Sequence, residues 1–454
     1  MTPEQERPQA VSFAEAVRFW LRLGFISFGG PAGQIAIMHR ELVEQKRWIS
    51  ERRFLHALNY CMLLPGPEAQ QLATYIGWLM HRSWGGIVAG GLFVLPSLFI
   101  LIALSWIYVA FGDVGWIAGL FYGMKSAVAA LVLHAVYRIG SRTLKSPREA
   151  PLLWAISIAS FLAIAVLNVP FPWVVLVAAL TGILGARLSP RQFDGGATHA
   201  AAKQAYGPAL IDDNTATPPH AIFSRARLAW VLLAGALLWL LPMATLVATQ
   251  GLDSTLAVMG LFFSKAALLT FGGAYAVLPY VYQGAVEQYQ WLSGPQMIDG
   301  LALGETTPGP LIMVVTFVGF LGGWKQQVLG PDAVFLGATL AALVTTWFTF
   351  LPSFIFILAG GPLVESTHGQ LRFTAPLTAI TAAVVGVIAS LAVFFIAHIA
   401  RRSDAAGVPG DIDVAALGLV LLAALALFRF KVGVIPVIAG CAVAGLLLRL
   451  AGVA

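Results

Sequence analysis

The chain has 454 residues, of which 59 % are hydrophobic and only 11 % are charged, with a formal net charge of +6. Soluble domains carry about 25 % charged residues, so the composition excludes an ordinary soluble protein and indicates a polytopic membrane protein. The positive charge falls in loops, which is typical of a signal for membrane orientation and not of nucleic-acid binding. Cys61 and Cys441 are too few for a disulfide framework, and the eight histidines show no ligand spacing, so we expect neither a metal nor a cofactor.

The apolar segments fall into two sets of six. Residues 1–10 are polar and lack the pattern of a cleaved signal peptide. A polar stretch at about 188–227, expected to be mobile and without chemistry, is followed by a lone span at 228–249. The expected segments lie at about 12–39, 54–80, 85–112, 115–138, 151–168 and 171–187, and then at about 255–283, 296–320, 331–360, 373–400, 412–428 and 432–450.

Two short motifs interrupt the first two segments, and both recur in the second half. In each half, 36 residues separate the first FGG glycine from the first PGP proline (29 to 65 and 272 to 308). Trp48 and Trp291 keep the same offset of 243. The sequence therefore predicts an internal duplication, carried by Ser27-Phe28-Gly29-Gly30-Pro31 with Leu64-Pro65-Gly66-Pro67, by Thr270-Phe271-Gly272-Gly273 with Thr307-Pro308-Gly309-Pro310, and by Leu95-Pro96-Ser97 with Leu351-Pro352-Ser353.

Glycine and proline at these positions predict broken helices. Glycine tolerates positive φ, and proline does not fit inside a helix but suits its first turn. We therefore expect one half-helix to end and another to begin at Gly30-Pro31, Gly66-Pro67 and Gly309-Pro310. A half-helix start offers unpaired N–H groups and the positive end of a dipole, which favours an anion site. Glycines spaced by four, in Gly86/Gly90 and Gly115/Gly119/Gly123, predict closely packed helices.

Lysines and arginines in short loops predict the orientation. Loops 39–56, 81–84 and 138–150 are basic and expected in the cytoplasm, whereas the connections at 112–115 and 168–171 are expected outside. This favours re-entrant hairpins at 12–39 and 54–80 over two ordinary crossings, and both alternatives stay open. Either one gives an even number of crossings per half, so the lone span inverts the second half. Arg401-Arg402 conflicts with this scheme, which puts it outside.

The expected fold class is an all-α polytopic membrane protein with two inverted-topology repeats. Each repeat carries interrupted or re-entrant helices, and a single linking span joins them. Residues 1–187 form the N-terminal repeat, residues 188–254 the polar cytoplasmic linker with the linking helix, and residues 255–454 the C-terminal repeat.

Polar groups near the breaks are candidate ligands of an oxyanion. Lys125 and Arg22 are candidates to neutralise its charge, although each is also explained as an interfacial side chain. Glu68 and Glu305 flank the PGP breaks, and a carboxylate at membrane depth is by default functional. Because an ionised carboxylate repels a bound dianion, these two are the candidate proton-coupling residues. The remaining expected ligands are Ser27, Gly29, Gly30, Gln34, Gly66, Gln70, Gln71, Thr270, Gly272, Gly273, Thr306, Thr307 and Gly309.

The motifs closely resemble those of the chromate ion transporter family. The resemblance covers nearly the whole chain and is to the long-chain form, in which two homologous halves are fused. It implies export of chromate across the inner membrane of a bacterium by a multi-pass protein, driven by the proton gradient and giving chromate resistance. One departure is that Ala274 follows the second FGG where Pro31 follows the first. The residues that carry the resemblance are Phe25-Ile26-Ser27-Phe28-Gly29-Gly30-Pro31, Trp48, Leu63-Leu64-Pro65-Gly66-Pro67 and Gln70-Gln71-Leu72-Ala73.

The residues alone predict a site for a tetrahedral anion and carriers for protons, and not the element chromium. We therefore expect a secondary active transporter of chromate, with an importer of sulfate or another oxyanion and a passive anion channel as alternatives. A membrane-embedded enzyme has no nucleophile–base pair or metal constellation to support it. The expected partners are the oxyanion, protons and the bilayer. A homodimer, the substrate choice, the direction and the stoichiometry stay open.

Overall fold

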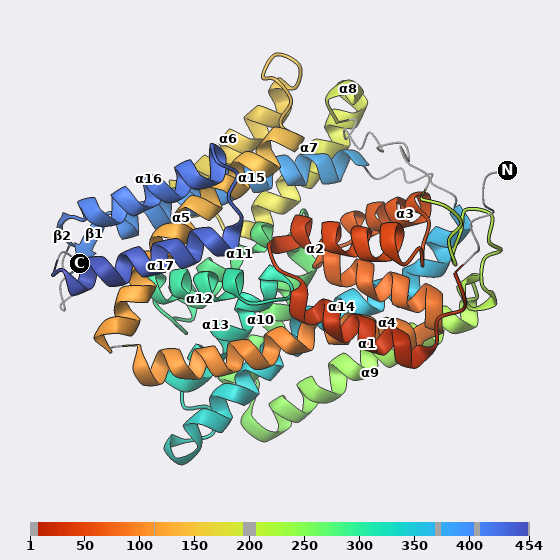
Figure 1. Cartoon of the computed structure of the whole chain (residues 1–454), viewed down its shortest axis with the longest axis horizontal. Helices are drawn as coiled ribbons and strands as arrows, with labels where there is room; N and C mark the ends of the chain where they lie inside the picture. Colours follow the sequence, from red (N-terminus) through yellow and green to blue (C-terminus); the bar gives the residue numbers. More distant parts are fainter. Residues whose placement is uncertain (1–7, 113, 194–205, 368–373, 404–408, 453–454) are drawn as a thin grey trace.

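The computed structural model describes residues 8–112, 114–193, 206–367, 374–403 and 409–452, which are largely helical (Figure 1). A short antiparallel ribbon between α15 and α16 holds Arg401, whose charge conflicts with the predicted orientation. The elements in chain order are α1 (Phe13–Ile26), α2 (Gly30–His39), the π-helix η1 (Arg40–Gln45), α3 (Glu51–Leu63), α4 (Glu68–Phe111), α5 (Gly115–Thr143), α6 (Pro151–Ala165), α7 (Phe171–Leu188), α8 (Pro190–Phe193), η2 (Pro219–Ala221), α9 (Arg225–Gln250), α10 (Thr255–Leu269), α11 (Ala274–Tyr282), the π-helix η3 (Gln283–Gln288), α12 (Gly294–Thr306), η4 (Leu311–Met313), α13 (Val314–Lys325), η5 (Pro331–Ala333), α14 (Val334–Thr367), α15 (Thr374–Ile399), β1 (Arg401–Ser403), β2 (Pro409–Ile412), α16 (Val414–Phe428) and α17 (Val434–Leu450).

Six helices of the described chain are long and apolar enough to cross a membrane, namely α4, α5, α7, α9, α14 with η5, and α15. The prediction of an all-α polytopic membrane protein is therefore confirmed. By contrast, α1 has 14 residues and α3 has 13, or about 20 Å at 1.5 Å per residue. This is short of the ~30 Å hydrocarbon core of a bilayer. The breaks thus divide segments 12–39 and 54–80 into pieces too short to cross alone, which favours the re-entrant alternative.

The long helix α4 is a hairpin of two antiparallel arms. His81 and Arg82 leave helical geometry, and Arg82 takes φ +56° and ψ −158°. Gly86 of the second arm faces the backbone of Thr74 in the first, and Gly90 faces Gln70. The glycine pair predicted to pack helices closely therefore does so within this hairpin. The turn at residues 81–82 separates the two predicted segments 54–80 and 85–112.

Backbone geometry repeats at the predicted offset of 243. The two π-helices begin at Arg40 and Gln283, which differ by that number. Each is followed by a residue at φ +50°, Arg47 in one half and Gln290 in the other. Serine N-caps then start α3 and α12, with side chains accepting from the N–H three residues later. The duplication is thus visible in unusual local conformations as well as in sequence.

The two halves are interleaved at their outer helices. The first-half helix α5 packs on α16 and α17, whereas the second-half helix α15 packs on α6 and α7 (Figure 1). Glycines allow both approaches: a side chain at Gly123 would meet the backbone of Cys441, and one at Gly386 would meet that of Ser157. Each half therefore contributes one long helix to the outer layer of the other.

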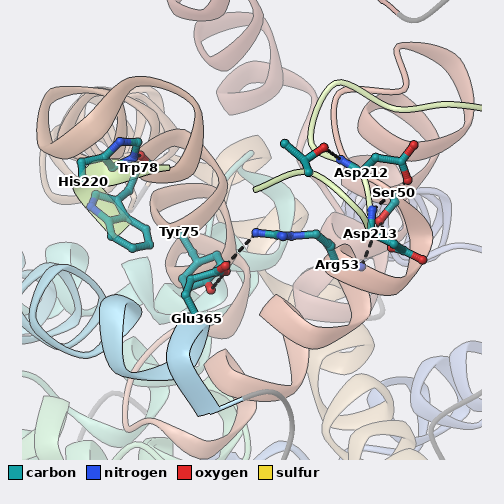
Figure 2. A network of polar contacts seen from close by, with 9 residues as sticks. Ser50, Arg53, Tyr75, Trp78, Asp212, Asp213, His220 and Glu365 are labelled. Carbon is teal, nitrogen blue, oxygen red and sulfur yellow. Dashed lines mark hydrogen bonds and ion pairs between the residues drawn. The ribbon is translucent and has the colours of Figure 1, made fainter. Parts of the chain in front are cut away.

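The described part of the linker lies against the N-terminal half (Figure 2). Ser50 donates its N–H to the Ile211 carbonyl at 3.0 Å and its hydroxyl to Asp213 at 2.6 Å. His220 Nε2 lies 2.9 Å from the Trp78 carbonyl oxygen. From residue 206 onward the linker is therefore docked on the N-terminal half, and its mobility stays a prediction. Residues 194–205, which that expectation also covers, lie outside the described residues.

Candidate functional site

The four predicted breaks are present, and they meet in pairs across the two halves. The Gly309 N–H donates to the Ser27 carbonyl at 2.8 Å, and the Gly66 N–H donates to the Thr270 carbonyl at 2.7 Å. Ser27 corresponds to Thr270, and Gly66 to Gly309, at the offset of 243. The two hydrogen bonds are therefore equivalent: in each, a PGP glycine of one half donates to the residue before the FGG motif of the other half. This is a local pseudo-twofold arrangement centred on the breaks.

The PGP glycines are tightly packed at these contacts. A methyl group added at Gly309 would lie 2.9 Å from Ser97 Cβ, and one added at Gly66 would lie 2.6 Å from Gln71 Nε2. The duplicated Leu-Pro-Ser motifs supply the packing, since Ser353 stands at Gly66 as Ser97 stands at Gly309. The expectation that the Gly66 and Gly309 amides hold the anion is wrong, because both N–H groups are donated to protein carbonyls.

The FGG glycines are packed less tightly than the PGP glycines. Gly29, Gly30, Gly272 and Gly273 all have positive φ, between +67° and +98°. An added methyl group at Gly30 would meet nothing within 4 Å. In the described chain, no protein acceptor takes a hydrogen bond from the N–H of these four glycines. Unpaired amides at the starts of α2 and α11 are the kind of donor that an anion site uses.

The predicted hydroxyl ligands are satisfied within their own helices. Ser27 and Thr270 donate to the carbonyls of Leu23 and Ala266, both at 2.7 Å. Such bonds to the preceding turn are the usual solution for a hydroxyl in an apolar helix. Thr306 and Thr307 likewise donate to Ala302 and Gly304. The expectation that these four hydroxyl groups donate to the oxyanion stays a prediction.

The three glutamines support the breaks. Gln34 Nε2 lies 2.5 Å from the Gly309 carbonyl oxygen, and Gln71 Nε2 lies 2.8 Å from that of Pro65. Gln70 Nε2 lies 3.0 Å from Thr74 Oγ1. In each case the side-chain oxygen is buried and has no hydrogen-bond partner in the described chain. These amide donors are used at the breaks, although Gln70 keeps a second N–H, and the expectation of glutamine ligands stays a prediction.

Glu68 and Glu305 lie at the breaks but differ in their surroundings. Glu305 is 5 % exposed and accepts a hydrogen bond from the Tyr275 hydroxyl. Glu68 begins α4, and its Oε1 lies 4.0 Å from the position of a Cβ at Gly273. The offset of 243 places Leu311 opposite Glu68 and Met62 opposite Glu305. The backbone at the breaks is therefore repeated in the two halves, but the two carboxylates are not.

Arg138 lies within α5, whereas the sequence predicted that a loop begins there. The helix α5 continues to Thr143, and the Arg138 charge acts on Glu68, Glu305 and Tyr275. Its guanidinium makes no hydrogen bond or ion pair within the described chain. The signal that could have revealed it is the spacing of His134, Arg138 and Arg142, which puts all three on one helix face.

Lys125 and Arg22 do not lie at the breaks. Lys125 Nζ pairs with Asp299 Oδ2 at 3.2 Å, and Asp299 lies eight residues before Thr307 on α12, about 12 Å away along the axis. Arg22 is exposed on α1. That either one neutralises an anion at the breaks stays a prediction. Asp299, a lone carboxylate in an apolar segment, carried the same signal as Glu305 and was missed.

No group of three or more histidine, cysteine or acidic residues in the described chain could hold a metal ion. Broken apolar helices from two halves, meeting at backbone amides, are typical of multi-pass membrane transport proteins. The family described as chromate transporter matches residues 14–183 and 257–446. The chain therefore belongs to the chromate transporter family, and it is a multi-pass protein of the bacterial inner membrane.

Relatives align along nearly the whole chain. A chromate transport protein of Cupriavidus metallidurans is 32 % identical over 434 residues, covering 95 % of this chain and 92 % of the relative. A chromate transport protein of Pseudomonas aeruginosa is 34 % identical over 441 residues, covering 96 % and 93 %. A probable chromate transport protein of Synechococcus elongatus is 28 % identical over 384 residues, covering 85 % and 84 %. No solved structure matches the chain.

Proposed function

We propose that the chain exports chromate across the bacterial inner membrane, with a proton-dependent site at the FGG breaks and inverted repeats on either side of it. The observation that carries the proposal is the reciprocal pairing of Gly309 with Ser27 and of Gly66 with Thr270. This pairing fixes the breaks of the two halves against each other. The relatives from Cupriavidus metallidurans and Pseudomonas aeruginosa, named chromate transport proteins, support the choice of substrate.

The dianion would be held by unpaired backbone amides. Gly29-Gly30 and Gly272-Gly273 offer N–H groups at the positive ends of α2 and α11. Arg138, whose charge reaches both site carboxylates, would supply the cation. Gln34 and Gln71 would act indirectly, because they hold the breaks in place.

Glu68 and Glu305 would make transport depend on pH. An ionised carboxylate close to the dianion repels it, so the anion binds better when the carboxyl group is protonated. Taken alone, this linkage moves a proton and the anion in the same direction, and it favours a proton-coupled importer of sulfate or another oxyanion as the second candidate. Export has a separate driving force, since an inside-negative potential of 100 mV expels two negative charges with about 4.6 kcal/mol.

The test is chromate uptake into inverted vesicles that carry the wild type, Glu68→Gln or Glu305→Gln, with the potential and the pH gradient collapsed separately. We expect uptake that requires the potential and that loses its pH dependence in both variants. Wild-type pH dependence in both variants would sink the role of the carboxylates.

The same vesicles separate the alternatives. Uptake found only in right-side-out vesicles, driven by an inward proton gradient, would identify an importer. Chromate loaded inside should accelerate entry of labelled chromate through a carrier, because each turnover returns the site. Flux without this exchange, following only the anion's own electrochemical gradient, would identify a channel.

A further inference from the structure

A polar pocket of about 590 Å³ opens between the halves, away from the breaks. It lies where α5, α12 and the end of α13 approach the second arm of α4 and the end of α17. Its polar lining includes Tyr108, Lys125, Asp299, Lys325 and Arg449. The site at the FGG breaks does not account for these groups.

The cations of this pocket outnumber its carboxylates. Asp299 accepts from Lys125 at 3.2 Å and from the Tyr108 hydroxyl at 2.9 Å, both at Oδ2. Its Oδ1 is buried and has no hydrogen-bond partner in the described chain. Lys325 gives one N–H to the Gln290 carbonyl at 2.7 Å, which leaves it two further donors. Arg449 is exposed at the rim.

Lys125 is positioned to pair either with Asp299 or with an anion in the pocket. Its side chain is 29 % exposed, whereas that of Asp299 is 3 % exposed. Asp299 thus holds Lys125 from the buried side, and the pocket reaches it from the open side. Two other groups stand nearby, Tyr122, which lines the pocket and donates to Asp413 at 2.8 Å, and His398, on which the Lys125 charge acts.

Charge and size fit a divalent oxyanion. Three cations against one carboxylate leave a local charge that a dianion would balance. A water molecule occupies about 30 Å³ of liquid, so the pocket has room for a tetrahedral oxyanion that keeps part of its hydration. The pocket is lined by Gly112, at the start of a connection predicted to lie outside.

We propose that this pocket is a second binding site for a divalent tetrahedral oxyanion, which contacts Lys325 and Arg449 and takes Lys125 from Asp299. The inference rests on the proposed function, because the anion is the one carried at the breaks. The ion pair it would open joins α5 of the first half to α12 of the second. Arrival of the anion at the outer site would therefore loosen the contact between the halves at this end.

The experiment measures chromate binding to the purified full-length chain by equilibrium dialysis at low ionic strength. The first variant is Lys325→Gln with Arg449→Gln, because neither residue pairs with an acid in the described chain. We expect it to lose one class of binding site or to weaken it at least fivefold. Lys265→Gln, an exposed lysine on α10, is the matched control and should bind like the wild type.

The second variant is Asp299→Asn, which removes the competitor for Lys125. We expect the outer site to bind chromate at least threefold more tightly, a gain that a misfolded variant would not show. Wild-type stoichiometry and affinity in both variants would overturn the outer site and leave the site at the breaks intact. Failure of the proposed function is a different result, namely no saturable chromate or sulfate binding by the wild type.

Discussion

Polar side chains in apolar surroundings form hydrogen bonds with nearby protein groups. These bonds decide which donors at the breaks are left to bind a ligand. The Ser27 and Thr270 hydroxyls are donated to the preceding helical turn. The Gln34 and Gln71 amide groups are donated to backbone carbonyls at the breaks. Within the described chain, the donors at the breaks that have no hydrogen-bond partner include the amides of the FGG glycines, the Arg138 guanidinium and the Ser97 hydroxyl. An anion at this site would thus be bound mainly by backbone, whose donors cannot rotate away.

At this scale we predict that Arg138→Gln weakens chromate transport through affinity. A hydrogen bond to a charged group is worth about 1.5–3 kcal/mol, so the chromate KM should rise by about ten- to a hundredfold. Lysine keeps the charge but not the planar fork, so Arg138→Lys should fall between the variant and the wild type. The measurement is initial uptake against chromate concentration in inverted vesicles.

The matched control is Arg142→Gln, one helical turn further along α5. Its charge acts on Glu68, but it lies nearer the helix end at Thr143. An exposed charge contributes about 0.2–1 kcal/mol, so its effect should stay within about fivefold. Equal KM values for Arg138→Gln and Arg142→Gln would remove Arg138 from the site.

The sequence predicted the residues at the breaks better than it predicted their roles. Gly29, Gly272 and their neighbours lie where the spacing puts them, because a break needs glycine wherever it occurs. Which amides stay unpaired depends on the hydrogen bonds with the partner break, and that break lies more than 200 residues away along the chain. Arg138 was missed because a basic residue at the end of an apolar run is normally a loop residue.

Among the helices, the PGP breaks are tightly packed, whereas the FGG breaks carry unpaired amides. Gly309 combines φ +99° with contact to Ser97, and a side chain in this conformation costs about 1–3 kcal/mol. We predict that Gly309→Ala shortens the half-life of the purified protein at elevated temperature. Gly418→Ala is the control, because Gly418 lies in α16 with nothing within 4 Å. There alanine should be neutral or stabilising by up to about 1 kcal/mol. Similar half-lives for both variants would contradict tight packing at this break.

Docking of the linker should depend on pH through His220. Burial, and then the charges of Arg82 and Arg227, lower the pKa of His220 from its ordinary value of 6.5. The docked histidine is thus neutral, and the undocked linker binds more protons as the pH falls below that value. Docking of the linker is therefore strongest above pH 6.5 and weakens as the pH falls below it.

We accordingly expect proteolysis of residues 206–224 to be faster at about pH 5.5 than at about pH 7.5, where an unperturbed histidine is neutral. His220→Gln should cleave at nearly the same rate at both pH values. A histidine variant that keeps the full pH dependence would assign it to another group.

Helix positions were largely predictable, because apolar runs and Gly-Pro punctuation mark them directly. The docking of the linker was not, since a polar segment with Asp212-Asp213 reads as solvated chain. Its contacts with Ser50 and Trp78 exist only once the first half has folded. The turn of α4 lies in the predicted connection 81–84 between two apolar segments.

In the whole molecule, the duplication was predictable and the interleaving of the halves was not. The matched spacing of the motifs is a property of the sequence, so the duplication can be recognised without a structure. The exchange of α5 and α15 depends instead on which glycine-lined faces meet, as Gly123 does with Cys441. Gly119 also packs on α17, which agrees with the predicted close-packing pattern, whereas Gly115 has nothing within 4 Å.

Two ion pairs join the halves at opposite ends of the second arm of α4. Arg53 and Glu365 pair at 2.6 Å, with the Tyr75 hydroxyl on the same carboxylate (Figure 2). Tyr75 precedes the Arg82 turn by about 10 Å of helix, and Tyr108, bonded to Asp299, follows it by about 39 Å. The two clusters are therefore about 30 Å apart, the thickness of the hydrocarbon core. Both ion pairs are formed in this structure.

If the Arg53 pair closes one end, breaking it should expose the interior on that side alone. Cys61, on α3 two turns beyond Arg53, is 0 % exposed and serves as the reporter, with Cys441→Ser to remove the other thiol. Glu365→Gln should speed alkylation of Cys61 by a water-soluble maleimide about tenfold, the factor that ~1.4 kcal/mol gives. The double exchange Arg53→Glu with Glu365→Arg should restore slow labelling, since it re-forms the pair. Asp299→Asn acts at the far end and should leave the rate unchanged. Labelling of Cys61 that is indifferent to Glu365→Gln, or that responds equally to Asp299→Asn, would mean that these contacts do not close separate ends.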